Sequence, residues 1–588
     1  MAQRRLIIVC SLLIALIGTG LWTARLLWQR RERAAVALAA VAPIPDLSRW
    51  PGELRQRIAT VSAAVRETSA PAGPLGRLAA LYWANGYATE AEQALAALRR
   101  LDPHNARWPY LQADLRWRAG DEAGAEKSLL ATVEIDAGYA PAWLRLADLQ
   151  VKRGAADLAR AGYTKAAAAG AGAARYDYSL IYFDAQHGGE REANLRRLLE
   201  LARRHPGIRE VHELLAGMLA DRDPAGAARE RREAAECECS LGTEDPWLDG
   251  LTDQCFDSNR LMLRAVALRR EGRLADAEKL LRKVVQLAAH EPPNPLGWQL
   301  LSDLYVKLER PAEARATLEQ GMAQFPDEPE MPLLLTRLLC TTQQPDAAVG
   351  IIQKAVERWP ARGDLRAALG LALHGAGRFV AAVAALRDAL RLDPTLTEAQ
   401  YQLGLSLLET GEPAEARAAL AKALAMRSDY PEAWFALAAV DLDAGDFAAA
   451  EPLVFKVYAL DPDEPNAQRL LASWHLLKGM ADARAAHPDE ADRHYRAGLA
   501  VAPEFGPLLL EAGRWAARHR QWPDAVEKLE HYIRVKPADP QGFLALGLAL
   551  RADGRTVEAA ALLERGLEAA RRAGDQAALQ EFSHLLGR

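Results

Sequence analysis

Cysteine is scarce in this chain, and basic residues are not in excess. The sequence has 5 cysteines among 588 residues, and its 73 lysines and arginines are balanced by 78 acidic residues, which gives a formal charge of −5. Proteins that bind nucleic acid carry clustered basic faces. Here Arg229, Arg231 and Arg232 are interleaved with Glu230 and Glu233, as on a solvated helix face. Nucleic acid is therefore not an expected partner.

The motifs of common enzyme classes are also missing. The sequence has no glycine-rich phosphate loop followed by lysine, no G-x-S-x-G, no H-E-x-x-H and no C-x-x-C. Its 12 histidines are scattered and form no ligand pair on an evident helix face. We therefore predict that the chain is not an enzyme, that it uses no cofactor and that it does not bind a small-molecule ligand.

What the chain does contain is a small residue at a regular interval. In residues 398–428, Tyr401, Leu405 and Leu408 mark one helical face, Gly411 breaks the pattern, and a second helical face begins at Ala416. Alanines recur at a constant interval in three runs: Ala91, Ala125 and Ala159; Ala314, Ala348, Ala382, Ala416 and Ala450; and Ala525 and Ala559. The interval of about 34 residues predicts stacked helical hairpins rather than one globular core.

Other residues keep the same register. Tryptophans open three of the units, and prolines fall where the second helix of a unit must stop: Trp143, Trp298 and Trp434; Pro103, Pro326, Pro360, Pro394, Pro462, Pro503 and Pro537. This pattern resembles the tetratricopeptide repeat family, in a membrane-anchored bacterial form. The resemblance implies an all-α, right-handed superhelical solenoid. We predict about fourteen hairpins, in arrays at residues 74–241 and 258–573, followed by a capping helix at residues 574–588.

The spacing of the alanines also shows where the array is interrupted. The step from Ala228 to Ala277 exceeds one repeat by about 15 residues. The step from Ala450 to Ala491 exceeds one repeat by about 7 residues, around positions 479–490. The first excess predicts an irregular insertion at residues 242–257.

Three interpretations of the first insertion stay open. It gathers Cys237, Cys239 and Cys255 with several acidic residues and Trp247. It could be a long loop whose Trp247 and Phe256 pack on neighbouring helices. In an exported protein, Cys255 could form a disulfide with Cys237 or Cys239. The three thiolates could also contribute to a metal site, although one residue between Cys237 and Cys239 is short for structural zinc.

The N-terminal segment predicts a membrane anchor at residues 1–28. Residues 6–24 carry no charge and are flanked by arginines. Nineteen helical residues reach about 28 Å, close to the hydrocarbon thickness of a bilayer. A cleaved signal peptide is the alternative, but this apolar run is longer than a typical signal core. We expect a single-pass protein of the bacterial inner membrane with its repeats in the periplasm, and a linker or stalk at residues 29–73.

The family resemblance implies that the first helices of the hairpins line a concave groove. In this register the groove residues are Trp83, Tyr110, Asp114, Trp117, Asp148, Tyr176, Phe183, Tyr401 and Phe435. Rigid aromatic side chains are effective anchors for extended peptides, although they could instead fill gaps between helices. We predict a membrane-anchored scaffold or adaptor that binds partner proteins or peptides and helps to assemble or localise an envelope complex. The alternative is a ligand or metal carrier centred on Cys237, Cys239 and Cys255.

Overall fold

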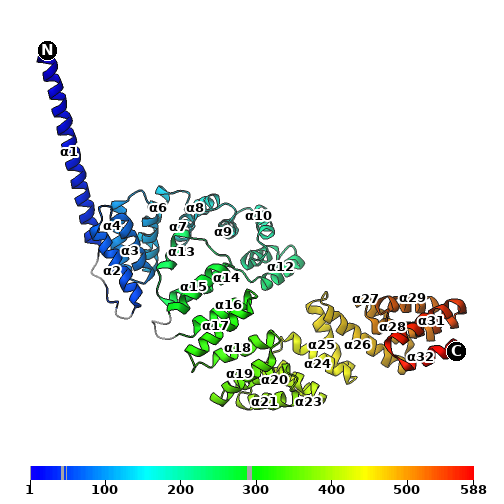
Figure 1. Cartoon of the computed structure of the whole chain (residues 1–588). Helices are drawn as coiled ribbons and strands as arrows, with labels where there is room; N and C mark the ends of the chain where they lie inside the picture. The colour runs from blue at the N-terminus through cyan, green and yellow to red at the C-terminus, as the bar shows by residue number, and fades with distance from the viewer. Residues whose placement is uncertain (1, 42–44, 48–49, 288–293, 588) are drawn as a thin grey trace. The chain divides into compact units, whose positions relative to one another are not determined.

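The computed structural model describes residues 2–41, 45–47, 50–287 and 294–587, and the side chains within these ranges from residue 21 onward. The described residues form 32 α-helices, one short 3-10 helix and one isolated β-bridge. The predicted all-α fold is confirmed. Helices α3 to α31, apart from the short α13, follow one another as fourteen helix-turn-helix pairs within the described residues (Figure 1).

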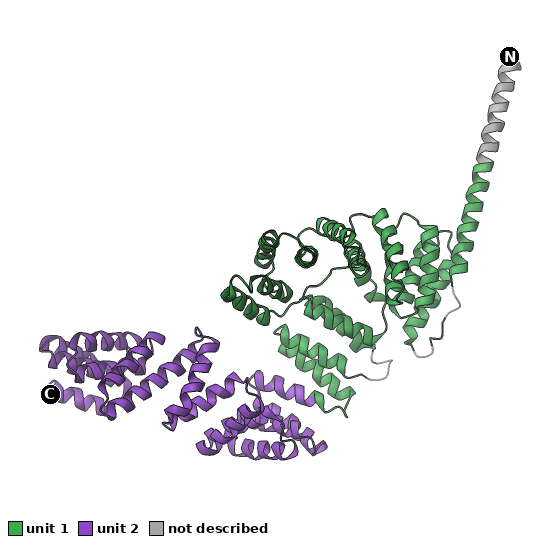
Figure 2. Ribbon diagram, turned by 180° about the vertical axis from the view of Figure 1, so that it is seen from behind, with its two compact units in different colours: residues 1–331 green, residues 332–588 purple. Residues whose placement is uncertain are grey.

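The chain divides into two compact units, an N-terminal unit (Met1–Met331) and a C-terminal unit (Pro332–Arg588) (Figure 2). The helices up to the division are α1 (Ala2–Ala40), α2 (Gly52–Glu67), α3 (Ala72–Ala84), α4 (Ala88–Leu101), α5 (Arg107–Arg118), α6 (Glu122–Ile135), α7 (Ala140–Lys152), α8 (Ala156–Ala169), α9 (Ala174–Gln186), α10 (Arg191–Arg204), α11 (Arg209–Leu219), α12 (Pro224–Glu236), α13 (Pro246–Asp249), η1 (Thr252–Gln254), α14 (Ser258–Arg270), α15 (Leu274–Leu287), α16 (Leu296–Lys307), α17 (Pro311–Gln324) and α18 (Glu330–Thr341).

Helix α18 crosses the division, and the remaining helices belong to the C-terminal unit. They are α19 (Pro345–Arg358), α20 (Gly363–Gly375), α21 (Phe379–Leu392), α22 (Thr397–Glu409), α23 (Pro413–Met426), α24 (Pro431–Asp443), α25 (Phe447–Leu460), α26 (Pro465–Arg484), α27 (Pro488–Val501), α28 (Gly506–Arg518), α29 (Trp522–Val535), α30 (Pro540–Ala552), α31 (Thr556–Ala573) and α32 (Gln576–Leu585). Each alanine of the regular register that the sequence identified is buried in its second helix, as Ala416 and Ala450 are at 0% exposure.

The turn inside thirteen of the fourteen hairpins that the structure describes, all except that of α11 and α12, contains a residue in the left-handed backbone conformation. Gly377, Gly411 and Gly445 occupy this position in three successive repeats, with φ angles of 71°, 80° and 74°. Glycine adopts such angles without steric cost because it has no Cβ. One repeat earlier the same position holds Gln343 with a φ of 58°. The fold therefore fixes the turn geometry even where the residue does not favour it.

The two helices of a hairpin approach most closely where a glycine faces a leucine. A Cβ added to Gly404 on α22 would lie 2.7 Å from Leu420 Cγ on α23. Gly547 and Leu563 repeat this contact in α30 and α31. In α24 and α25 the same register holds alanine and valine, both fully buried: Ala438 and Val454. The sizes of the two side chains at this contact are therefore complementary. The smallest residue, glycine, is paired with leucine, and the larger alanine is paired with the smaller valine.

We expect Gly404→Ala to destabilise the C-terminal unit by about 1–2 kcal/mol, although alanine favours a helix by roughly 1 kcal/mol over glycine. The reason is that the new methyl group overpacks against Leu420. Adding Leu420→Val should restore most of the loss, because the double variant reproduces the natural alanine and valine pair. Urea unfolding of both variants measures the effect. A single variant as stable as the wild type would contradict this explanation.

The segment predicted as a linker is partly packed against the array. Residues 29–73 contain the end of α1 and all of α2, and Leu54, Ile58 and Val65 of α2 are buried. At the end of α1, Arg33 Nη2 donates a hydrogen bond to the carbonyl of Leu101 at 3.2 Å. Apolar side chains at helical spacing give α2 a face that it can bury against α3.

The predicted membrane span, residues 6–24, belongs to α1, but its side chains up to residue 20 lie outside the described residues. Among the residues that are described, no helix has both the length and the apolar character that crossing a membrane requires.

The second insertion lengthens a helix of the array. Helix α26 has 20 residues, whereas α24 and α28, which open the hairpins before and after it, have 13 residues each. In the lengthened hairpin, His475 Nδ1 of α26 lies 3.1 Å from His494 Nδ1 on α27. Burial, together with the neighbouring His494, lowers the pKa of His475 to about 4. The histidine is therefore neutral in the folded protein near pH 7.

Helix α32 covers the end of the last hairpin. Its Phe582 is fully buried and packs in a core cluster with Phe543, Leu563 and Leu567. A solenoid leaves one apolar edge at each end, and a terminal helix with a polar outer face can bury that edge.

Candidate functional site

The insertion after α12 crosses from one hairpin to another inside the N-terminal unit. Cys239 forms a parallel β-bridge with Ile208, and its carbonyl accepts a hydrogen bond from Arg209 N at 3.1 Å. The next residue, Ser240, donates its backbone N–H to the carbonyl of Arg270 at 2.6 Å. The backbone of the insertion is thus paired on both sides before it turns towards the first helices of the array.

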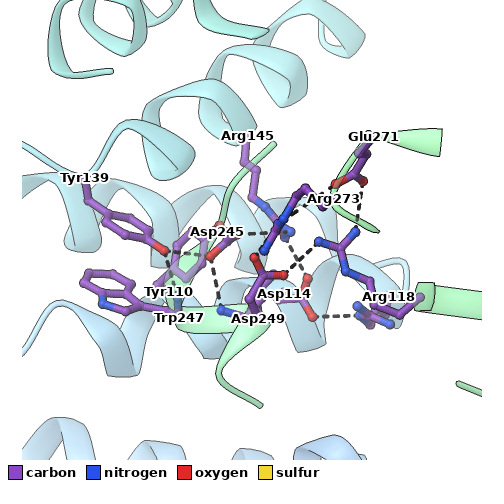
Figure 3. Close-up of polar contacts among 12 residues, drawn as sticks. Tyr110, Asp114, Arg118, Tyr139, Arg145, Asp245, Trp247, Asp249, Glu271 and Arg273 are labelled. Carbon is purple, nitrogen blue, oxygen red and sulfur yellow. Dashed lines mark hydrogen bonds and ion pairs between the residues drawn. The ribbon is translucent and has the colours of Figure 1, made fainter. Parts of the chain in front are cut away.

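Asp245 fixes the centre of the insertion against α5 and the start of α7. Its carboxylate accepts hydrogen bonds from the hydroxyls of Tyr110 and Tyr139, the latter at 2.6 Å (Figure 3). It also accepts from Leu248 N at 3.2 Å and thereby caps α13. Asp245 is only 6% exposed, and Tyr110 is fully buried. A buried carboxylate is tolerated because these donors replace the water that it has lost.

Trp247 packs on the same two tyrosines. Its ring stacks on Tyr139 with centroids 3.6 Å apart, and it meets Tyr110 edge-on at 5.4 Å. Trp247 N also donates to the hydroxyl of Tyr139 at 3.3 Å. Aromatic pairs of this kind contribute about 0.5–1.5 kcal/mol beyond the burial of their area. Trp247 therefore holds the insertion in place together with Asp245.

The tyrosines titrate far from neutral pH. Burial raises the pKa of Tyr110 well above its usual value, and the negative charge of Asp245 adds to this increase. Burial and then Asp245 raise the pKa of Tyr139 in the same way. Burial raises the pKa of Tyr176 to about 12. These phenols therefore keep their protons, and Tyr110 and Tyr139 act as permanent donors to Asp245.

An arginine on α7 links two buried acids. Arg145 Nη1 lies 2.7 Å from Asp114 Oδ1, and its Nη2 lies 3.7 Å from Asp245 Oδ2. Asp114 also pairs with Arg118 at 2.7 Å, and the guanidinium of Arg118 lies over the ring of Trp83 at 4.9 Å. The concave side of α5 and α7 is thus a connected network of charges and aromatic rings (Figure 3).

The far end of the insertion returns to the first hairpin. The side-chain amide of Asn85, at the end of α3, donates to the carbonyl of Gln254 at 2.9 Å, and its oxygen accepts from Phe256 N at 2.7 Å. Arg57 of α2 and Lys283 of α15 lie over the ring of Phe256, at 5.2 Å and 5.0 Å from its centroid. Residues far apart in the sequence therefore meet, and the first six hairpins form a closed loop.

Ion pairs join the insertion to α14 as well. Asp249 pairs with Arg264 and Arg273, each at 2.8 Å, and Arg264 also pairs with Glu271 at 3.0 Å. These groups are partly buried, so they are less screened than surface pairs. The insertion is consequently held by α5 and α7 on one side and by α14 on the other.

A cavity of about 820 Å³ lies inside this loop. Its walls come from α3, α5, α7, α9, the insertion and α14. They combine two tryptophans, Trp83 and Trp117, with apolar and charged side chains. Ligand pockets usually have volumes of about 300–1,000 Å³, so this cavity is of a size that can hold a ligand or a peptide segment.

Comparison with known proteins identifies the repeat. Two tetratricopeptide repeat family models match the chain, one at residues 268–338, 373–421 and 407–473, the other at residues 77–141, 333–396 and 510–577. Together they cover more than half of the 588 residues. This chain is a tetratricopeptide repeat protein.

The tetratricopeptide repeat protein is also similar to individual proteins. It is 37% identical over 104 residues to Protein FlbA of Caulobacter vibrioides, a match that spans 17% of each chain. It resembles a solved thermophilic tetratricopeptide repeat protein of Thermus thermophilus, with 24% identity, 31% of this chain and 98% of that chain covered, and a TM-score of 0.27. It also resembles PilW, a type IV pilus biogenesis factor, with 19% identity, 36% and 98% covered, and a TM-score of 0.32.

Four of the predicted groove residues of the tetratricopeptide repeat protein line one cavity. They are Trp83, Asp114, Trp117 and Asp148, and they lie on α3, α5 and α7. Lys152 lies over the ring of Trp117 at 4.3 Å. The structure therefore brings Trp83 and Trp117 to the wall of one cavity.

The other predicted groove residues have different places. Tyr110 is covered by the insertion, because Asp245 and Trp247 contact it. Tyr176 and Phe183 are 6% and 5% exposed and pack in a core cluster of α7, α8 and α9. They fill gaps between helices, which was the open alternative. In the C-terminal unit Tyr401 packs against Tyr430 with centroids 5.0 Å apart, and Phe435 is 38% exposed: both lie outside the cavity.

Cys237, Cys239 and Cys255 are all free thiols in the structure, and the disulfide interpretation of the insertion stays a prediction. Cys237 Sγ contacts the carbonyl of Pro206 at 3.6 Å, whereas Cys255 Sγ contacts that of Asp257 at 3.7 Å. Burial raises the pKa of both thiols, so they are protonated at neutral pH. Within the described ranges, no group of three or more histidine, cysteine and acidic side chains is arranged to hold a metal ion.

Sequence reasoning missed the residues that attach the insertion. Asp245, Arg145, Tyr139 and Asn85 were not singled out, although each makes a contact that closes the loop. One signal was available: Asp245 precedes a proline, as N-cap residues of short helices often do. That signal indicates a helix start but does not reveal the distant tyrosines.

Proposed function

We propose that this tetratricopeptide repeat protein is a non-catalytic, membrane-anchored scaffold that binds a partner protein or peptide on its N-terminal concave face. The observation that supports it best is the cavity, where Trp83 and Trp117 remain on the wall and the loop around them is held by buried polar contacts. A rigid, concave surface with aromatic side chains is suited to peptide binding, since little flexibility is lost when a partner binds.

The proposed membrane anchor is residues 1–28, and the proposed location is the bacterial inner membrane with the repeats facing the periplasm. An uncharged run at residues 6–24 between flanking arginines supports this part of the proposal. Deleting residues 1–28 should move the protein from the membrane pellet to the supernatant of lysed cells. A truncated protein that stays in the pellet after an alkaline wash would contradict the anchor.

A role in assembling or localising an envelope complex can be tested by cross-linking in cells. A photoreactive benzoylphenylalanine is placed at Leu263, which lines the cavity and is 73% exposed. The control position is Val557 on α31, which is 83% exposed in the C-terminal unit. We expect adducts with envelope proteins at position 263 that are absent at position 557. Identical adducts at both positions, or none at 263, would contradict a binding site in the cavity.

The alternative of a metal carrier has no support from Cys237, Cys239 and Cys255. Cys237 and Cys255 contact different parts of the chain, and their thiols are protonated rather than ready to bind a cation.

A further inference from the structure

Most charges on the cavity wall are already paired within the protein. Among the acids, Asp114 pairs with Arg118 and Arg145, and Asp148 accepts from the hydroxyl of Tyr163 at 2.7 Å. Asp249 and Glu271 pair with arginines of α14 and of the turn that follows it. Asp245 accepts from two tyrosines. These acids thus already have partners within the protein, although Glu271 Oε2 has only Arg273 Nη1 at 4.0 Å and no hydrogen-bond donor among the described residues.

One cation on the wall differs from the others. Arg175, on α9, lines the cavity, and its Nε is buried without a hydrogen-bond acceptor among the described residues. It also forms no ion pair within the described part of the chain. Arg260, by comparison, reaches the carbonyls of Trp83 and Ala84, both at 3.4 Å. A buried donor without an acceptor is unfavourable, and a ligand that supplies an acceptor would remove that cost.

A second donor on the same wall lacks an acceptor. The indole Nε1 of Trp83 is buried and has no hydrogen-bond partner among the residues that the structure describes. The apolar part of the wall is partly open to solvent, since Leu263 of α14 is 73% exposed. The wall of the cavity therefore carries two donors, one of them charged, and an apolar side chain that is still in contact with water.

We propose that this cavity binds an extended peptide segment of a partner protein that carries an acidic side chain next to an apolar one. The carboxylate pairs with Arg175, and the apolar side chain covers Leu263. An arginine can hold a carboxylate through two parallel hydrogen bonds, which makes the guanidinium a specific anchor for it. This inference rests on the proposed function and names the chemistry of the partner.

A peptide suits the cavity better than a small inorganic anion. An anion alone would leave Leu263 and the tryptophan rings of Trp83 and Trp117 exposed to water, whereas a peptide covers them and supplies backbone carbonyls as further acceptors. A volume of about 820 Å³ is large for a single ion. The mixture of charged and apolar walls thus matches a segment with both kinds of side chain.

The test uses an array of amidated heptapeptides in matched pairs. The first peptide of each pair contains one aspartate flanked by leucines, and the second has asparagine in place of that aspartate. Full-length protein in detergent is applied as wild type, Arg175→Gln and Arg231→Gln. Arg231 is an exposed residue of α12 outside the cavity wall, so it is a matched control. We expect at least tenfold tighter binding of the aspartate members by the wild type and the control, and equal binding of both members by Arg175→Gln.

A second variant keeps the test independent of any folding defect. Leu263→Asp changes an exposed side chain, and its thermal melting curve should match the wild type while peptide binding falls at least tenfold. Equal binding of aspartate and asparagine peptides by the wild type, or a preference that survives in Arg175→Gln, would overturn the inference. If cross-linking at position 263 still captures envelope proteins in that case, the proposed scaffold function stands and only the acidic partner is wrong.

Discussion

Replacing Asp245 with alanine should detach the insertion and destabilise the N-terminal unit by about 3–5 kcal/mol, the range seen when one partner of a buried charged pair is removed. The variant leaves the hydroxyls of Tyr110 and Tyr139 without their acceptor, and it removes one of the two acids beside Arg145. Because Tyr110 is fully buried, water cannot replace the carboxylate without opening the site.

Hydrogen exchange measures this effect locally, which is preferable to one global transition in a repeat protein. The amides of Trp247 and Leu248 donate to Tyr139 and to Asp245, so both should exchange faster in Asp245→Ala. Glu244→Ala is the control, since the neighbouring residue is exposed. Unchanged exchange at these two amides, with an unchanged melting temperature, would show that Asp245 does not hold the insertion.

Trp298→Ala should be comparably severe, with a loss of about 3–5 kcal/mol, because a large buried ring is replaced by a cavity. Trp298 is 2% exposed, packs against Met331 and meets Phe325 edge-on with centroids 5.0 Å apart. Neighbouring hairpins are held together by such contacts, so the loss affects the interface between repeats as well as one hairpin. Urea unfolding followed by circular dichroism measures it.

Trp143 provides a matched control for this prediction. It occupies the same position of the repeat as Trp298, but it is partly exposed, and Lys165 lies over its ring at 4.2 Å. Trp143→Ala should therefore cost less than half as much as Trp298→Ala. Equal losses for the two variants would mean that register, rather than burial, decides the contribution of this tryptophan.

The regular part of the fold was predictable because it depends on local contacts. The register shared by Ala416 and Ala450 indicated the hairpins and their number, since each hairpin packs on its sequence neighbours. The close contact of Gly404 with Leu420 follows from the same register. A repeat therefore carries enough information to place its own helices.

The attachment of the insertion could not be predicted in the same way. Asn85 meets Phe256 only because the small rotations between successive hairpins add up to bring the first hairpin to the sixth. The sequence shows several acids in the insertion, and nothing in their spacing indicates that Asp245 alone is buried between two tyrosines. Because the contact with Asp245 could not be foreseen, Tyr110 was predicted to line an open groove, whereas the insertion covers it. Trp83 and Trp117 line the cavity, and their positions follow from the register of their own repeats.

The closed loop changes how the N-terminal unit responds to tension. A solenoid whose hairpins touch only their neighbours can lengthen like a spring, since small rotations at each interface add together. Here the hydrogen bonds between Asn85 and residues 254 and 256 connect the first hairpin to the end of the insertion, and Arg260 of the sixth hairpin reaches the carbonyls of Trp83 and Ala84. Pulling on the two ends of these six hairpins therefore strains that junction before the hairpins can separate. The first part of the chain is in this sense a stiff ring, whose elasticity is set by a few polar contacts.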